Sequence, residues 1–357
     1  YGSDAEGLGL CLAADREHVT AHRPIPPMVN IRSAVSRLSL VALAHTMSTT
    51  FGTSSEPPGL CRTTGRLLRL SGVPGYEQHR RNDILLLSPA AETPGRCDNH
   101  TEGLQSANAH VVFFPGDIQN FQQEMAVQAE AVPWLSWSLE HVAFIMGNRF
   151  PGRHIWVIRA SHMYLHKFSC YQNFVESNLF GAPEHSSDYG AIRQLRGLVG
   201  HGMEQAGLPN PLPPLGGAAV PLPLPQDFSL SLVGFSKGCV VLNQMVYELA
   251  GARADSELRP FLDRISDVYW LDGGHPGGSE TWVTDKRALS ELATSGVALH
   301  AHVTPYEVQD PMRAWVGREH RSFIKTLEEL GACVTHRLHF EDEPASIENH
   351  FRVIKEF

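Results

Sequence analysis

Hydrophobic and polar positions along this chain follow two repeating patterns. Short apolar runs typical of buried strands alternate with stretches that carry apolar residues at helical spacing. The pattern predicts strands at 66–70, 84–87, 110–114, 154–158, 228–233, 268–271, 297–303 and 334–340. It predicts helices at 138–150, 188–204, 240–249, 286–295 and 318–330. Strands separated by single helices pair in parallel, so we expect a doubly wound, mostly parallel α/β sheet with helices on both faces and an antiparallel edge at its first two strands.

The regular pattern occupies residues 65–357, which we expect to form one domain. Two stretches interrupt it. Residues 161–189 are too long for a plain connection and are interpreted as a lid or pocket wall, because loops at the carboxyl ends of parallel strands build the pocket. The alternative is a packed loop and helix with an aromatic core. Residues 207–227 hold seven prolines, which predicts a surface insertion.

Residues 1–60 show no such pattern and are interpreted as a leader. From Met28 to Ser55 there is no Asp or Glu, and Arg32 and Arg37 lie among serines and apolar residues. A basic, acid-free, Ser-rich stretch is typical of a mitochondrial transit peptide. The alternative is a secretory signal, which would make the protein secreted, with an apolar region from Leu38 to Leu43.

Composition narrows the classes of function. The chain has 357 residues and a net charge of −9, which argues against nucleic acid as its main partner. No run approaches 18 consecutive apolar residues, so no transmembrane helix is predicted. The six cysteines are scattered, which favours free thiols in a reducing compartment.

The strand at 228–233 leads directly into a helix through Gly234-Phe-Ser-Lys-Gly238. This G-x-S-x-G pattern is typical of a nucleophile elbow, in which a cramped strand-to-helix turn exposes a serine, here Ser236, beside the helix N-terminus. An ordinary glycine-flanked turn is the alternative. The elbow predicts the α/β-hydrolase fold.

A serine nucleophile requires a base and an acid, which in this fold follow it in the order acid, then histidine. His350 is the only histidine beyond the last predicted strand, and the alternative for it is an exposed residue near the C-terminus. Asp310, after the strand at 297–303, is the expected acid, although it also suits a turn before Pro311. Asp272, after the preceding strand, is the alternative acid.

The oxyanion hole needs two backbone N–H groups, which we expect from Lys237 and Asp117. The Asp117 carboxylate would repel an oxyanion unless it points away. The Lys237 side chain is expected to be a solvated charge. Tyr164, Phe168 and Tyr171 are expected in the substrate pocket.

Two histidine pairs, His162 with His166 and His300 with His302, have spacings compatible with metal binding. Neither pair has a Cys or carboxylate partner at a diagnostic spacing, so no metal site is predicted. The predicted hydrolytic chemistry requires no cofactor.

Most of the domain, from about His110 to Phe357, resembles the family designated chromosome 2 open reading frame 69. The resemblance rests on long blocks, namely Phe114–Asp117, Trp137–Glu140, Leu165–Tyr171, Phe180–His185, Gly234–Gln244, Tyr269–His275, Asp310–Arg313 and Ser346–Val353. It implies a mitochondrial, α/β-hydrolase-like protein related to esterases and lipases, without a settled substrate. It also implies Ser236 and His350 as the reactive pair.

The sequence thus predicts a serine hydrolase acting on an ester, thioester or lipid-like acyl substrate through a Ser-His-Asp triad. The alternative is a hydrolase fold with weak or no catalysis that binds or regulates another mitochondrial protein.

Overall fold

The computed structural model describes residues 65–89, 108–178, 181–216 and 223–357. The predicted leader at 1–60 lies outside these ranges, as does the centre of the proline-rich stretch. Contacts between residues group Leu60–Phe357 into one compact unit.

An eight-stranded sheet runs through the described residues. The strands lie in the order β1 (Arg66–Pro74), β2 (Arg81–Ser88), β4 (His154–Ile158), β3 (Ala109–Phe114), β9 (Ser229–Phe235), β10 (Ile265–Leu271), β11 (Ala298–Val303) and β12 (Val334–Leu338). β2 is antiparallel to both of its neighbours, and every other neighbouring pair is parallel. The predicted mostly parallel sheet with an antiparallel edge is confirmed.

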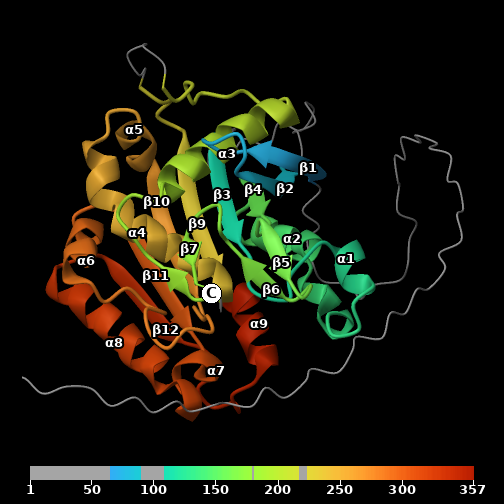
Figure 1. Cartoon of the computed structure of the whole chain (residues 1–357), viewed down its shortest axis with the longest axis vertical. Helices are drawn as coiled ribbons and strands as arrows, with labels where there is room; N and C mark the ends of the chain where they lie inside the picture. The colour runs from blue at the N-terminus through green and yellow to red at the C-terminus, as the bar shows by residue number, and fades with distance from the viewer. Residues whose placement is uncertain (1–64, 90–107, 179–180, 217–222) are drawn as a thin grey trace, which may run out of the picture. The chain divides into compact units, whose positions relative to one another are not determined.

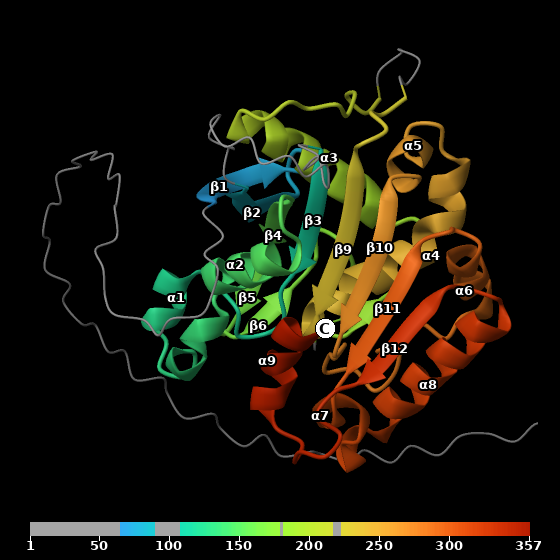
Figure 2. The ribbon, with the colours of Figure 1, turned by 180° about the vertical axis from the view of Figure 1, so that it is seen from behind.

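Helices cover both faces of this sheet. Figure 1 looks onto the face that carries α3 (Ala191–Ala206), α4 (Cys239–Ala254), α6 (Lys286–Ala293) and α8 (Ala314–Glu329), which share one apolar core with it. The view from behind in Figure 2 shows α2 (Leu139–Arg149) and α9 (Ile347–Glu356), which pack on the other face in a second core. The shorter helical segments are α1 (Gln122–Ala126), η1 (Val132–Trp137), η2 (Ser236–Gly238), α5 (Arg259–Leu262), α7 (Pro305–Val308) and η3 (Pro311–Arg313). No helix in the described ranges is both long and apolar enough to cross a bilayer.

The central helix α4 is buried on nearly every side, because it lies between the sheet and its neighbouring helices. Its Glu248 accepts hydrogen bonds from the backbone N–H groups of residues 190–192 at 2.8–3.0 Å. A buried carboxylate therefore caps the N-terminus of α3, where the helix dipole favours negative charge.

The two interrupting stretches contain little regular structure. In the described part of 161–189 the chain forms two small hairpins, β5 (His162–Tyr164) with β6 (Phe168–Cys170) and β7 (Glu176–Ser177) with β8 (Pro183–Glu184). They replace the helix that the alternative interpretation expected. In the proline-rich stretch, Leu212 and Leu224 are each 5% exposed. The stretch therefore contributes two side chains to the core, which a purely superficial insertion would not.

Candidate functional site

The chain turns sharply between β9 and α4 and holds Ser236 in a strained conformation. Ser236 has a φ of +51°, in the left-handed region that non-glycine residues rarely adopt. Glycines on both sides allow the turn. A Cβ on Gly234 would lie 3.0 Å from the Cα of Cys239, and one on Gly238 would lie 2.0 Å from the Phe114 carbonyl oxygen. The segment therefore has the geometry of a nucleophile elbow.

Parallel pairing brings the ends of the neighbouring strands to the same edge of the sheet as Ser236. The last residue of β9 pairs with the last residue of β10, and Gly234 pairs with the last residue of β3. Asp272, which follows β10, and the loop 115–118, which follows β3, therefore lie beside the elbow. A Cβ on Gly116 would approach the Ser236 Cβ to 2.7 Å.

His350 lies on α9 and is hydrogen-bonded to Asp272. Its Nδ1 is 2.7 Å from Asp272 Oδ2. Asp272 is fully buried, and its carboxylate also accepts the Thr304 backbone N–H at 2.7 Å and the Thr304 hydroxyl at 2.5 Å. Because a carboxylate can only accept, it favours the tautomer of His350 with the proton on Nδ1. The Nε2 lone pair is then available as a base.

Asp310, the expected acid, does not lie against His350, and that expectation is corrected in favour of Asp272. The Asp310 carboxylate accepts the Met312 N–H and the Arg313 Nε–H, both at 2.8 Å. These bonds lower its pKa, with the Arg313 guanidinium as the main cause. Asp310 is the N-cap of η3, so the turn-forming role of an Asp before proline prevails here.

Ser236 and His350 line one cavity of about 590 Å³. The His350 ring lies between the rings of Phe235 and Tyr306, with centroid distances of 4.6 and 4.9 Å. Since Phe235 directly precedes Ser236, this packing holds the imidazole near the elbow. Within the described residues no hydrogen bond joins the Ser236 hydroxyl to His350, and such contacts are often long until substrate binds.

Two backbone N–H groups near Ser236 are available to an oxyanion. That of Lys237 lies in the first turn of a helix, where N–H groups have no intrahelical partner. That of Asp117 forms no hydrogen bond with any other described residue. The Asp117 carboxylate accepts the Ser169 N–H at 2.7 Å through Oδ1, so one of its oxygens is directed toward the β6 strand.

The Lys237 side chain is buried, with 5% exposure, and the expectation of a solvated charge is wrong. Its Nζ donates to the Gly181 carbonyl. Burial lowers the pKa of Lys237. The elbow is thereby linked to the stretch between β7 and β8.

The stretch 161–189 is tied to the oxyanion loop by several hydrogen bonds. The Tyr171 hydroxyl donates to the Pro115 carbonyl at 2.6 Å, and the Ser169 hydroxyl donates to the Gly116 carbonyl at 2.8 Å. The Ile118 N–H donates to the Lys167 carbonyl at 2.7 Å. The insertion therefore fixes the backbone that would face a reacting carbonyl.

Of the three residues expected in the pocket, only Phe168 lines the cavity. Tyr171 is 1% exposed and belongs to the core behind the oxyanion loop. Tyr164 is 57% exposed and does not line the cavity, although it pairs with Phe168 across the β5–β6 hairpin. Those two expectations are corrected.

Glu307 and Arg313 also line the cavity, and neither is among the site residues predicted from the sequence. Glu307 is 4% exposed, and burial raises its pKa to about 7. Arg313 Nη1 lies 2.8 Å from Glu307 Oε2. A Cβ on Gly274 would come within 2.6 Å of this carboxylate. The sequence signal that could have identified Glu307 was its position, because Glu307 lies closer than Asp310 to the end of β11.

Neither histidine pair belongs to a cluster of metal ligands among the described residues. His302 Nδ1 is 2.8 Å from His339 Nε2, and His300 Nε2 is 3.2 Å from Asp267 Oδ1. Across the part of the chain that the structure describes, no group of three or more His, Cys, Asp or Glu residues could hold a metal ion.

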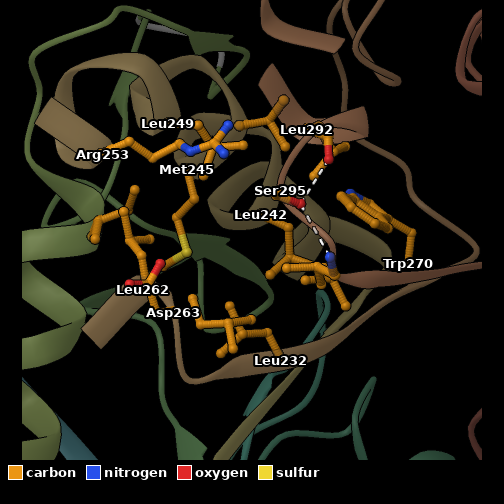
Figure 3. Close-up of a pocket in the computed structure, with 15 residues that line it drawn as sticks. Leu232, Leu242, Met245, Leu249, Arg253, Leu262, Asp263, Trp270, Leu292 and Ser295 are labelled. Atoms are coloured by element: carbon orange, nitrogen blue, oxygen red, sulfur yellow. Dashed lines mark hydrogen bonds between the residues drawn. The ribbon is translucent and has the colours of Figure 1, made fainter. Parts of the chain in front are cut away.

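A second cavity lies beneath α4, among apolar side chains such as Leu242, Met245 and Trp270 (Figure 3). Its volume is about 60 Å³, room for only a few water molecules. Ser295 closes one side by donating to the Leu292 carbonyl at 2.6 Å. None of the triad candidates lines this cavity, so we interpret it as a packing void.

The strand order and the elbow define an α/β-hydrolase fold. When the eight strands of the sheet are numbered alone, their order is 1-2-4-3-5-6-7-8 with the second strand antiparallel, which is the arrangement of that class. Similar solved structures include a Mycobacterium tuberculosis puromycin-hydrolysing peptidase, with 10% identity and a TM-score of 0.42 over 84% of this chain and 39% of the peptidase. M. tuberculosis MPT51 has 11% identity and a TM-score of 0.42, covering 82% and 94% of the two chains. The topology, rather than these distant likenesses, defines the class.

Within that class, the chain belongs to the C2orf69 family, whose model matches residues 69–211 and 201–333. The Danio rerio "Mitochondrial protein C2orf69 homolog" is 73% identical over 330 residues, 92% of this chain and 96% of the relative. The Homo sapiens "Mitochondrial protein C2orf69" is 43% identical over 331 residues, 81% and 86% of the two chains. The mitochondrial localisation expected from the sequence is confirmed by these relatives.

Proposed function

We propose that this protein is a mitochondrial serine hydrolase that cleaves an ester, thioester or lipid-like acyl substrate. The observation that supports this most strongly is the 2.7 Å contact between His350 Nδ1 and Asp272, formed at the sheet edge where the elbow ends. Two residues 78 positions apart meet beside a strained serine, and a packing role alone does not require this combination.

In this proposal Ser236 attacks the acyl carbon while His350 Nε2 takes the hydroxyl proton. Asp272 holds the ring and stabilises the imidazolium that forms. The N–H groups of Lys237 and Asp117 bind the oxyanion, each contributing on the order of 3 kcal/mol of transition-state stabilisation. His350 then protonates the leaving group, and a water molecule releases the acyl group by the same steps in reverse.

A fluorophosphonate probe tests the proposal, because it reacts much faster with an activated serine than with other side chains. The wild type should be labelled, and Ser236→Ala, His350→Ala and Asp272→Asn should lose labelling. Asp310→Asn is the matched control, since it makes the same chemical change on the η3 cap and should retain labelling. A folded wild type that the probe does not label would contradict the proposal.

One observation favours the second candidate, a binding or regulatory hydrolase fold without turnover. No hydrogen bond joins the Ser236 hydroxyl to His350 among the described residues. A protein of that kind would stay unlabelled although thermal melting shows it folded, whereas an active hydrolase would be labelled at a rate that depends on His350.

A further inference from the structure

The charged groups that line the 590 Å³ cavity are unequal in number. Four of them are carboxyl groups, one of which, Glu307, has a pKa that burial raises to about 7, and two are basic; they are Asp117, Glu130, Glu307, Asp310, Lys167 and Arg313. A concave site lined by an excess of charges of one sign focuses the electrostatic field and raises the local concentration of ligands of the opposite charge. The cavity is therefore electrostatically suited to a cation.

Both basic groups are already engaged. Lys167 Nζ lies 3.0 Å from Glu130, and Arg313 lies 2.8 Å from both Glu307 and Asp310. Among the described residues that line the cavity, Asp117 is then the one carboxylate that forms no ion pair. Neither basic side chain is left to attract an anionic substrate.

Asp117 lies close to the reacting centre. It follows Gly116, whose Cβ, if present, would approach the Ser236 Cβ to 2.7 Å. Its Oδ1 accepts the Ser169 N–H at 2.7 Å, and its Oδ2 has no hydrogen-bond partner among the described residues. Lys237 acts on Asp117 electrostatically, but its ammonium group donates to the Gly181 carbonyl instead. Burial raises the pKa of Asp117, which a bound cation would counteract.

Aromatic rings complete the wall of the cavity, where Trp134, Phe168, Tyr306 and Phe351 supply its lining. Trp134 and Phe351 stack with a centroid distance of 5.1 Å, and Phe351 also stacks on Trp137 at 5.6 Å and is 1% exposed, so Phe351 has no open ring face to offer. Ring faces attract cations through their quadrupoles, most strongly where water is displaced. Rings combined with an unpaired carboxylate suit a cationic nitrogen better than an aliphatic chain.

We propose that the substrate carries a cationic nitrogen within a few bonds of its scissile carbonyl, and that Asp117 is the residue that recognises it. This inference rests on the proposed hydrolase function and narrows its substrate class. The cation can belong to the acyl group or to the leaving group, because Asp117 is close to the carbonyl itself.

The test uses isosteric pairs that differ only in charge. Acetylthiocholine is compared with 3,3-dimethylbutyl thioacetate for a cation on the leaving group. The p-nitrophenyl esters of 4-(trimethylammonio)butanoic and 5,5-dimethylhexanoic acids are compared for a cation on the acyl group. The readouts are the ratio of kcat/KM within each pair and the slowing of fluorophosphonate labelling by each compound.

We expect the wild type to prefer the cationic member of at least one pair by about 10- to 100-fold, the range of a hydrogen bond or contact to a charged group. Asp117→Asn should reduce that ratio below about threefold, and added salt should reduce it in the wild type. Asp310→Asn removes the same charge from a carboxylate that is half-buried and paired with Arg313, so it should leave most of the preference.

Equal or reversed ratios in a protein that hydrolyses the neutral compounds would overturn this inference and leave the hydrolase proposal standing. So would labelling of Ser236 that no cationic compound slows. A preference that persists in Asp117→Asn would also overturn it, because the charge responsible would lie elsewhere. A folded wild type that the probe does not label would instead remove the hydrolase proposal itself.

Discussion

Replacing Asp272 by asparagine separates a catalytic carboxylate from a merely buried one. In the structure Oδ1 accepts the Thr304 N–H at 2.7 Å, and Oδ2 lies 2.7 Å from His350 Nδ1. An asparagine that keeps the first bond must place its amide NH₂ against His350. That NH₂ donates to Nδ1, so the ring proton moves to Nε2. The ring can then no longer accept the Ser236 proton.

The expected loss in kcat is about 10⁴-fold, the size found when a triad aspartate is replaced in this way. It corresponds to about 5.5 kcal/mol of transition-state stabilisation at 1.36 kcal/mol per tenfold. The change also costs folding stability. The hydrogen bonds of His350 and of the Thr304 hydroxyl to Oδ2 are both weakened, at about 1.5–3 kcal/mol each.

The assay is the rate of fluorophosphonate labelling, or of hydrolysis of an activated ester, measured beside thermal melting of the same samples. Asp310→Asn is the matched control, with an expected change in rate below about threefold. A folded Asp272→Asn protein that keeps its rate within about tenfold of the wild type would refute the role given to Asp272. Equal losses in both variants would point to a general electrostatic effect.

Three further changes, the first with a matched control, test other parts of the structure. Gly238→Ala would place a Cβ 2.0 Å from the Phe114 carbonyl oxygen, so it should lower the free energy of chemical unfolding by about 3 kcal/mol or more. Gly251→Ala is its control, because a Cβ there meets nothing within 4 Å, and it should raise the unfolding free energy by up to about 1 kcal/mol. Tyr171→Phe removes the 2.6 Å hydrogen bond to the Pro115 carbonyl, which should cost about 1 kcal/mol of stability. It should also lower kcat more than it changes KM. A change in KM alone would contradict a role of Tyr171 in holding the oxyanion loop. Burial raises the pKa of Glu307 from 4.5 to about 7, so its contribution to stability is present below pH 4.5 and is lost as pH rises to 7. The unfolding free energy of Glu307→Gln should therefore improve relative to that of the wild type by about 3 kcal/mol across that window. A difference in urea unfolding that does not depend on pH would contradict the buried carboxyl.

The centre of the sheet could be predicted because β3, β4 and β9 are largely apolar runs, which a sheet covered on both faces requires. The strand His154–Ile158 matches its prediction to the residue and is buried at every position. Helix ends were less accurate, since caps such as Glu248 on α3 come from distant elements. The hairpins of 161–189 carry weak local signals, and their conformation depends on contacts with the oxyanion loop.

The order of the elbow, the strands and the last histidine along the chain was enough to locate the candidate site. The residues around each aspartate were not enough to choose the acid. Ser236 and His350 follow from the elbow and the last strand, and both line the same cavity. Asp310 and Asp272 could not be separated by position, because both follow parallel strands at the same edge. The choice depends on α7 and η3, two short segments that place Asp310 against Arg313. The Asp310-Pro311 pair indicates a turn there, but local spacing gives no indication that the turn directs the carboxylate to Arg313.

The most direct test of the account is peptide mass spectrometry of the protein after reaction with a fluorophosphonate. The account predicts a phosphonate on the peptide that contains Ser236, formed in the wild type and in Asp310→Asn but not in His350→Ala or Asp272→Asn. A folded wild type that carries no adduct, or carries it on another residue, would contradict the claim that Ser236, His350 and Asp272 act together.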